Sequence, residues 1–285
     1  MSTQQRKAAP RAEIERMADL LARNARLNDP LPPGTDFSPE GSKAVQDQLN
    51  ALAILPHEHL HYLYLAFSAK YLAALVHALR AANRETQRRA VSTYIQILSL
   101  LPDPKGNPYL RRYLRSPRAA GLPNLVADHF VKGIDWLRPS GPGDLCTLHI
   151  HFLFYCDTQM GDDKRASIDK ALRDALAGKL ADLSAQPDFS ALPELQRVEV
   201  QRLMGILNVL EQMPADYYLK STQDHLLGSI SGQEECDVCM DDDAEMLCSQ
   251  CKAVRYCSKE CQMKAWKEGH KRNCWKMLDG TGKDF

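Results

Sequence analysis

Eight residues near the C-terminal end of the sequence have the types and spacing of metal ligands. Seven of the nine cysteines and one histidine fall within 236–274. They form the pairs Cys236/Cys239, Cys248/Cys251, Cys257/Cys261 and His270/Cys274. A C-x-x-C turn points both sulfurs at one ion, and a spacing of four places two ligands on one face of a helical turn. Eight ligands fill two tetrahedral zinc sites and leave no position for water or substrate. The spacing alone allows sequential, interleaved or nested pairing.

Zinc explains these residues better than disulfides or ordinary core packing. Chance placement of four correctly spaced pairs within 236–274 is improbable. Disulfides are rare in the reducing compartment that we expect for this chain. A segment of this length also buries too little apolar surface to fold alone, so bound metal must supply the missing stability. We therefore predict two zinc ions per chain.

The order of these residues resembles that of a MYND-type zinc finger. The shared features are the two C-x-x-C turns, "RYCSKECQ", Trp266 and "HKRNC", and they cover 236–274 only. The resemblance implies that the ligands interleave. On that basis zinc 1 is held by Cys236, Cys239, Cys257 and Cys261, and zinc 2 by Cys248, Cys251, His270 and Cys274. Around them we expect a hairpin through "EMLCSQCKAVRYC", then a helix capped by Ser258 and a short last helix over 270–277.

The resemblance also implies a function, because MYND fingers bind short proline-rich peptides. Carried over by position, the peptide contacts are Ser249, Gln262 and Trp266. Gln262 and Trp266 are four residues apart and share a helix face, and an indole offers a flat surface to a proline ring. Trp266 as a small structural core and Gln262 as a solvated side chain are the alternatives. We expect the finger, lying after the helical region, to be free to reach a partner.

A second zinc pattern lies far upstream, in "HEHLH". The pattern H-E-x-x-H, here His57, Glu58 and His61, holds zinc in many metallopeptidases. Those helices extend upstream of the first histidine, whereas Pro56 favours a helix that begins near His57. The residues after His61 offer no clear third ligand. We expect solvated histidines at a helix start, and we keep a zinc metallopeptidase as the alternative function.

Other catalytic arrangements fit less well, so we expect no enzymatic activity. The mid-chain set Cys146, His149, His151 and Cys156 lacks repeated ligand spacing and is expected in the core. The resemblance also implies two enzyme classes to check, because MYND fingers occur attached to SET methyltransferase domains and to prolyl hydroxylase domains. Here too few residues follow the finger for a SET domain to resume, and no histidine has the H-x-D spacing of the hydroxylases.

The elements before the finger are predicted to be helical. Helical periodicity runs through 13–27, 42–55, 60–80, 85–101, 124–137, 163–183 and 194–213. Segments rich in proline and glycine separate them. "CTLHIHFLFYC" suits a strand or a buried helix, and its helical neighbours favour the helix. The fold class is thus mostly α, with a polar helix and a proline-rich linker over 1–40, a helical domain over 41–230 and the finger over 236–274. Residues 75–98 resemble part of an armadillo repeat, and an unclassified helical domain is the alternative.

Charge and hydropathy restrict the partners. The 36 basic and 36 acidic residues balance, which does not favour nucleic acid or an anionic membrane surface. No stretch has the unbroken apolar length of a membrane span, and the first residues lack a signal-peptide core. We expect an intracellular protein, in the nucleus or cytoplasm, that binds proteins with proline-rich motifs, with transcriptional regulation as one setting. The alternative is a structural finger beside a helical domain that binds the partner.

Overall fold

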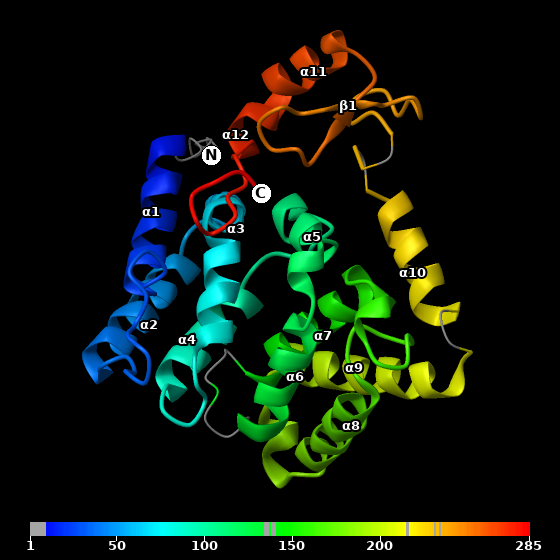
Figure 1. The fold of residues 1–285 in the computed structure, drawn as a ribbon. Coiled ribbons are helices and arrows are strands. Elements are labelled where there is room, and N and C mark those ends of the chain that lie inside the picture. The colour runs from blue at the N-terminus through cyan, green and yellow to red at the C-terminus, as the bar shows by residue number, and fades with distance from the viewer. Residues whose placement is uncertain (1–9, 134–136, 138–140, 215–216, 231, 234) are drawn as a thin grey trace, which may run out of the picture.

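A computed structural model describes residues 10–133, 137, 141–214, 217–230, 232–233 and 235–285 (Figure 1). Its larger part consists of α1 (Arg11–Asn24), α2 (Pro39–Ala53), α3 (His57–Ala81), α4 (Arg88–Ser99), α5 (Pro108–Leu114), α6 (Leu122–Gly133), α7 (Pro142–Tyr155), α8 (Lys170–Ser184), α9 (Glu194–Gln212) and α10 (Tyr217–Gly228). Short helical turns η1 (Pro117–Ala119), η2 (Thr158–Met160) and η3 (Pro187–Ala191) join some of them.

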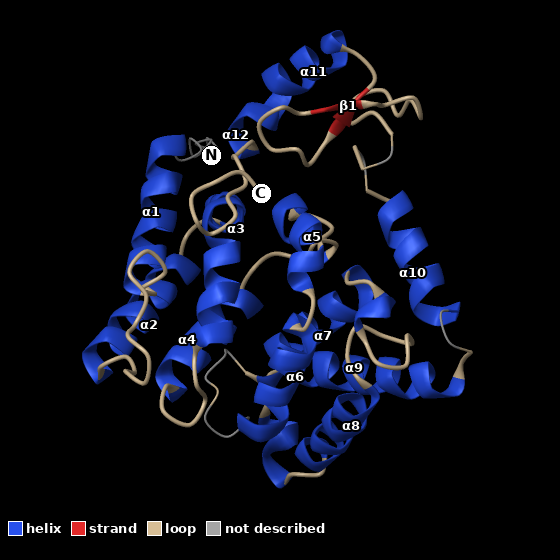
Figure 2. Ribbon diagram, viewed as in Figure 1, coloured by secondary structure: helices blue, strands red, loops and turns tan. Residues whose placement is uncertain are grey.

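The finger contains the two strands that the described residues form (Figure 2). These are β1 (Met246–Leu247) and β2 (Arg255–Tyr256), followed by α11 (Lys259–Ala265), a π-helical segment (Trp266–His270) and α12 (Lys271–Asn273). The predicted fold class, mostly α with a small C-terminal two-zinc finger, is confirmed. The armadillo-like assignment and the proposed domain boundaries stay predictions.

Helix α3 is the core helix of the first half of the molecule. It begins at His57, directly after Pro56, as the sequence predicts. It packs against α1, α4 and α5, and its middle is buried on most sides, from Leu63 to Leu79. Its length and composition would suffice to cross a membrane, but 72% of the apolar window is buried inside the protein. Such burial is typical of a core helix.

Helix α7 has the same role in the second half. It packs against α9, α10, α4 and α6, and nearly all of its residues are buried. The prediction of a helix rather than a strand for "CTLHIHFLFYC" is therefore confirmed. The run of β-branched and aromatic residues reflects burial on every face rather than a pleated strand.

Some predicted helix bounds differ from the structure. The helix expected over 163–183 begins only at Lys170, because the preceding residues fold back into a turn. A side chain at Gly161 would lie 2.1 Å from the carbonyl oxygen of Ala166, so the chain passes too close for any other residue. Helices α5 and α10 were not predicted. Residues 1–9 of the predicted N-terminal segment and 134–136 of the predicted helix 124–137 lie outside the described residues.

The chain after the finger ties it to the helical domain (Figure 1). The expected last helix over 270–277 is wrong beyond Asn273, where α12 ends. Instead Trp275 and Met277 are buried, and the backbone N–H of Leu278 donates to the carbonyl of Ala69 in α3 at 2.9 Å. Gly280 (φ +87°) lets the returning loop approach α3, where a Cβ would meet the Ala74 nitrogen at 3.0 Å. The finger is therefore in contact with the helical domain, and the expectation that it is free to reach a partner stays a prediction.

Candidate metal centre and peptide-binding face

The first cluster of donor atoms comes from both ends of the hairpin and from α11. Cys236 and Cys239 form one turn, Cys257 follows β2 and Cys261 lies in α11. The sulfur of Cys239 lies 3.4 Å from that of Cys257 and 3.8 Å from that of Cys261. A tetrahedron with zinc–sulfur bonds of about 2.3 Å has sulfur–sulfur edges of about 3.8 Å. The donor set and its spacing therefore fit zinc.

The second cluster contains three sulfurs and one imidazole and is more deeply buried. The sulfurs of Cys248 and Cys274 are 3.6 Å apart. His270 presents Nε2, which lies 3.4 Å from the sulfur of Cys248 and 3.6 Å from that of Cys251. All donor atoms of each cluster lie within 4.8 Å of one another, in the interleaved pairing that the resemblance implies. The two clusters are the two zinc sites of the finger.

Zinc binds the thiolate form of cysteine. The surroundings favour this form at Cys236 and Cys248, whereas hydrogen bonds with neighbouring sulfurs raise the pKa of Cys257 and of Cys274. Burial opposes ionisation of Cys236, but hydrogen bonds from the backbone of Cys239 and Cys257 lower its pKa to about 6. At Cys248, hydrogen bonds with Cys251 and Cys274 lower the pKa well below the ordinary value for a thiol. Both sites are coordinatively closed once four protein ligands bind. They can build a surface, but they hold no water for hydrolysis.

Both C-x-x-C turns have the same backbone conformation. The N–H of Met240 donates to the carbonyl of Cys236 at 3.0 Å, and the N–H of Lys252 donates to that of Cys248 at 2.9 Å. Met240 and Lys252 both have a positive φ, of 60° and 54°. This turn points the paired sulfurs the same way and reverses the chain. The C-x-x-C spacing therefore goes together with one backbone turn as well as with a pair of metal ligands.

The hairpin and α11 position the remaining ligands. Met246 pairs with Tyr256 and Leu247 with Arg255. The Tyr256 ring is buried and lies edge-on to the His270 ring, with centroids 6.2 Å apart. The Ser258 hydroxyl accepts from the backbone N–H of Cys261 at 3.2 Å, which is the predicted helix cap. These contacts orient two zinc ligands, His270 and Cys261.

The three predicted peptide contacts have different surroundings. Ser249 is exposed and Gln262 is half-buried. The backbone N–H of Trp266 donates to the carbonyl of Gln262, so the two side chains lie one helical turn apart. Trp266 is 37% exposed, and its ring lies edge-on to His270 at 6.1 Å between centroids. Trp266 therefore both shields a zinc ligand and offers free surface, and its role in peptide binding stays a prediction.

Three side chains of the helical domain hold the backbone beside zinc 2. The guanidinium of Arg11 donates to the carbonyls of Cys274 (2.9 Å) and Lys271 (2.8 Å). That of Arg112 donates to the carbonyl of Cys251 at 3.3 Å, and Tyr109 accepts from the backbone N–H of Trp275 at 2.6 Å. Sequence reasoning missed these residues. The one available signal was Trp275, a large apolar residue directly after the last ligand.

The residues of the H-E-x-x-H pattern do not form a metal site among the described residues. His57 and His61 stack with ring centroids 6.4 Å apart, and the described residues contain just the two clusters of the finger as candidate metal sites. His57 and Glu58 are exposed at the first turn of α3. The pattern is the solvated helix start that its proline predicts.

The mid-chain cysteines and histidines are core residues, as expected. Cys146, His149 and Cys156 are at most 1% exposed. The Nδ1 of His149 lies 2.6 Å from the carbonyl oxygen of Leu145, while His151 faces Asp103 at 3.5 Å. Burial raises the pKa of both the Cys146 and Cys156 thiols. Neither sulfur has the exposed, electropositive surroundings of a nucleophile.

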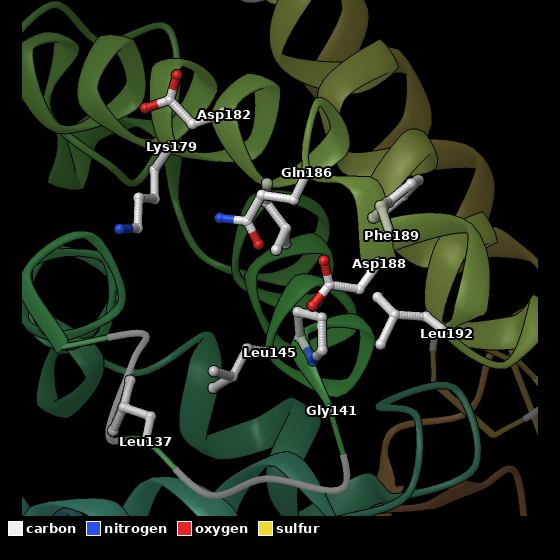
Figure 3. Close-up of a pocket in the computed structure, with 11 residues that line it drawn as sticks. Leu137, Gly141, Leu145, Lys179, Asp182, Gln186, Asp188, Phe189 and Leu192 are labelled. Atoms are coloured by element: carbon white, nitrogen blue, oxygen red, sulfur yellow. The ribbon is translucent and has the colours of Figure 1, made fainter.

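A pocket of about 290 Å³ lies where the start of α7 meets α8 and η3 (Figure 3). Its described lining combines apolar side chains with Lys179, Asp182, Gln186 and Asp188. Leu145 and Leu192 contribute apolar surface, and Lys179 and Asp182 lie together on α8 (Figure 3). The described lining contains no cysteine, histidine, serine or tyrosine, and so it offers no hydroxyl or thiol nucleophile.

Known proteins resemble the chain over limited segments. Ubiquitin carboxyl-terminal hydrolase 17 of Arabidopsis thaliana is 39% identical over 80 residues, which make up 28% of this chain and 11% of that protein. Ubiquitin carboxyl-terminal hydrolase 19 of the same plant is 49% identical over 45 residues, or 16% and 6% of the two chains. Ubiquitin C-terminal hydrolase 15 of Oryza sativa subsp. japonica is 50% identical over 40 residues, or 14% and 4%.

The chain thus spans a small fraction of the length of these relatives, and no solved structure matches it. The family match is restricted to one segment as well. It covers 236–274 and carries the description MYND finger. The matched residues run from the first to the last of the eight zinc ligands. Residues 236–274 therefore belong to the MYND finger family.

Proposed function

We propose that the protein is a non-enzymatic adaptor whose finger docks a proline-containing segment of another protein. The main support is that the partly exposed Trp266 lies one helical turn from Gln262. The finger that presents them has zinc sites with four protein ligands each. A proline ring or a leucine side chain would rest on the indole, and the Gln262 amide would bond the peptide backbone. We place the adaptor inside the cell, in the nucleus or cytoplasm, and transcriptional regulation is one setting for it.

We do not propose for this chain the hydrolase activity that the names of the relatives state. The matched segments are 11% or less of those proteins. In this chain the two cysteines outside the zinc sites are buried with raised pKa values, which makes them poor nucleophiles. We therefore propose that this chain shares an interaction module with these proteins and does not share their catalytic activity.

Binding of a proline-rich peptide array to the full chain tests the proposal. Trp266→Ala should weaken binding at least about tenfold, because one aromatic contact dominates a short peptide interface. Met263→Ala is the matched control, since Met263 is 55% exposed on the same helix, and it should change affinity little. Zinc content of the Trp266→Ala protein must be measured because its indole contacts His270. Unchanged binding by a variant with two zinc ions would contradict the proposed groove.

A second candidate function follows from the contacts of Arg11, Tyr109 and Arg112 with the finger. They make the finger part of one body with the helical domain. In that case the finger is structural and the helical domain binds the partner. Binding that survives both Trp266→Ala and Gln262→Ala would favour this candidate.

A further inference from the structure

A cleft of about 470 Å³ separates the finger from α5. We call it the basic cleft. One wall is α5 and the residues just after it, and the other is the second C-x-x-C turn with β1 and β2. It is lined by Pro108, Arg111, Arg112, Arg115, Ser116, Gly232, Gln233, Leu247, Lys252, Ala253, Arg255 and Phe285.

The described lining carries five cationic side chains and no carboxylate side chain, and its one anionic group is the terminal carboxylate of Phe285, which accepts from Arg112 at 3.2 Å. In a chain with 36 basic and 36 acidic residues this is a strong local imbalance. None of the ion pairs between side chains of the described residues involves Arg111, Arg112, Arg115, Lys252 or Arg255. Zinc 2 with three thiolates carries a formal charge of about −1, which offsets only part of this charge.

Two buried arginines show how unusual the cleft is. Arg173 is 2% exposed, and carboxylates of Asp163 and Glu211 neutralise it. Arg111 is 4% exposed, yet its described hydrogen-bond partners are all neutral. It donates to the side-chain oxygen of Gln233 at 2.9 Å and to the carbonyls of Pro104 and Lys105. Burial lowers the pKa of Arg111 to about 10, although the Asp103 carboxylate attracts its charge without forming an ion pair. A buried charge without a paired counter-charge is costly. An anion that entered the cleft would supply a closer partner.

The fold holds the other charges in place. Arg112 donates to the carbonyl of Cys251 (3.3 Å) and to a terminal oxygen of Phe285 (3.2 Å), so its guanidinium is fixed between the two walls. Arg255 pairs with Leu247 across the hairpin, and paired residues point to the same face of a sheet. That face lines the cleft. The neighbouring pair of Met246 and Tyr256 points the other way, toward His270.

The hairpin therefore separates the basic cleft from the Trp266 surface. Trp266 contacts His270 on the side where Tyr256 points, while Leu247 and Arg255 line the cleft on the opposite face. A ligand of the cleft and a proline-rich peptide on Trp266 would occupy different faces of the finger. The inference about the cleft therefore does not depend on the proposed function.

The lining also indicates which kind of anion fits. Apolar groups of Leu247, which is 42% exposed, and of Phe285 lie among the cations. A free phosphate ion would leave this apolar surface uncovered, and nucleic acid needs a broad cationic face that a chain of balanced charge lacks. Arginine forks match carboxylates in geometry. We propose that the basic cleft binds an acidic peptide segment of a partner protein. Its Asp or Glu side chains pair with the arginines, and one apolar side chain rests on Leu247.

Fluorescence anisotropy with the full zinc-loaded chain tests this proposal. The probe is a labelled peptide of alternating Glu and Asp with one central Leu, and its matched control replaces the acids with Gln and Asn. We expect the acidic peptide to bind and the neutral peptide to bind at least about tenfold more weakly. Raising NaCl from about 50 mM to about 300 mM should weaken the acidic peptide further, because salt screens exposed charges.

Charge reversal locates the site. Arg115 and Lys252 are exposed cleft residues, and Arg115→Glu/Lys252→Glu should reduce acidic-peptide affinity at least about tenfold. The control Arg16→Glu/Lys259→Glu makes the same charge change at exposed positions outside the cleft, and should cost less than about threefold. Arg115→Gln/Lys252→Gln, a milder pair, keeps the test valid if the reversed pair loses zinc. Trp266→Ala should leave acidic-peptide binding unchanged.

Three outcomes would overturn the proposal. One is equal affinity for the acidic and neutral peptides, and another is equal loss in the cleft and control variants. The third is inorganic phosphate that binds as tightly as the acidic peptide with the same dependence on Arg115 and Lys252, which would make the cleft a small-anion site. Loss of proline-rich peptide binding alone would bear on the Trp266 surface and not on the cleft.

Discussion

The backbone N–H of Trp275 donates a 2.6 Å hydrogen bond to the hydroxyl oxygen of Tyr109, which in turn donates to the carbonyl of Asn273 at 2.7 Å. Trp275 directly follows the zinc ligand Cys274, and Tyr109 lies in α5. The indole N–H of Trp275 also donates to Glu15 at 3.0 Å. Two helices thus hold the chain where it leaves zinc 2, so the stability of the finger and that of the helical domain are coupled.

Tyr109→Phe should lower the free energy of unfolding by about 1–3 kcal/mol. The substitution leaves the buried N–H of Trp275 without its partner, and an unsatisfied buried donor costs that much. Urea unfolding of the zinc-loaded protein measures the change. Tyr217→Phe is the control, because Tyr217 is 63% exposed, and its effect should stay within about 0.5 kcal/mol. Equal stability of the two variants would show that the Tyr109 hydroxyl does not hold the finger.

Removal of zinc should affect the helical domain as well as the finger. A strong chelator should release two zinc ions per chain and unfold 236–274, because the ligands supply most of the stability of that segment. The contacts of Arg11 and Tyr109 with the finger would then be lost. Hydrogen exchange should therefore rise at the start of α1 and in α5, while α8 and α9, which pack on each other, stay protected.

Single ligand substitutions refine this prediction. Cys248→Ala should remove zinc 2 and raise exchange in α5, because Cys248 contacts both Cys274 and His270. Cys146→Ala, at a buried cysteine outside both clusters, should keep two zinc ions. Unchanged exchange in α5 after loss of zinc would mean that the finger and helical domain unfold independently.

The sequence predicts the parts of this structure that are set locally. The short spacing within each ligand pair, the Ser258 cap and the helix start after Pro56 each depend on residues within a few positions, whereas the assignment of pairs to the two zinc sites came from the family resemblance. Helix α7 was predictable from its neighbours, although its own residues favour strands. Helix α5 was not, because it has seven residues and lies next to a segment rich in proline and glycine.

The docking of the finger depends on pairs that are far apart in the chain. Arg11 and Cys274 are 263 positions apart, and Tyr109 and Trp275 are 166 apart. No periodicity or motif links such pairs in a single sequence. The basic cleft could not be predicted for the same reason, because its cations come from α5 and from the finger. The balanced charge of the whole chain gives no sign of it either.

His61→Ala should leave the zinc content at two ions per chain. The His57 and His61 rings stack at the start of α3 and belong to neither described cluster. Elemental analysis of the purified variant measures the content, and His270→Ala is the positive control because His270 belongs to zinc 2. We also expect no zinc-dependent peptidase activity from the wild-type chain. Loss of one zinc equivalent in His61→Ala would restore the metallopeptidase alternative.

Stability should fall as the pH is lowered from about 6.5 to about 4, in part because of His129. This side chain is 4% exposed, and neither ring nitrogen has a hydrogen-bond partner among the described residues. Burial lowers its pKa to about 4, whereas an unfolded histidine has a pKa of about 6.5. Between these values the unfolded chain binds a proton that the folded chain does not. The stabilisation is present above about pH 6.5 and is lost as the pH falls, by at most about 1.4 kcal/mol per pH unit.

His129→Leu isolates this contribution from that of the zinc ligands, which also titrate in acid. At pH 7.5 the variant should be as stable as the wild type or more stable, because leucine removes two buried polar atoms without partners. Below pH 6.5 its unfolding free energy should fall less steeply, by up to about 1.4 kcal/mol per pH unit. His225→Leu, at an exposed histidine, should keep the wild-type slope. His149 is also buried, and burial lowers its pKa to about 4, so the slope of His129→Leu should be reduced rather than abolished. Parallel curves for His129→Leu and the wild type would show that His129 takes up a proton in the folded state as readily as in the unfolded state.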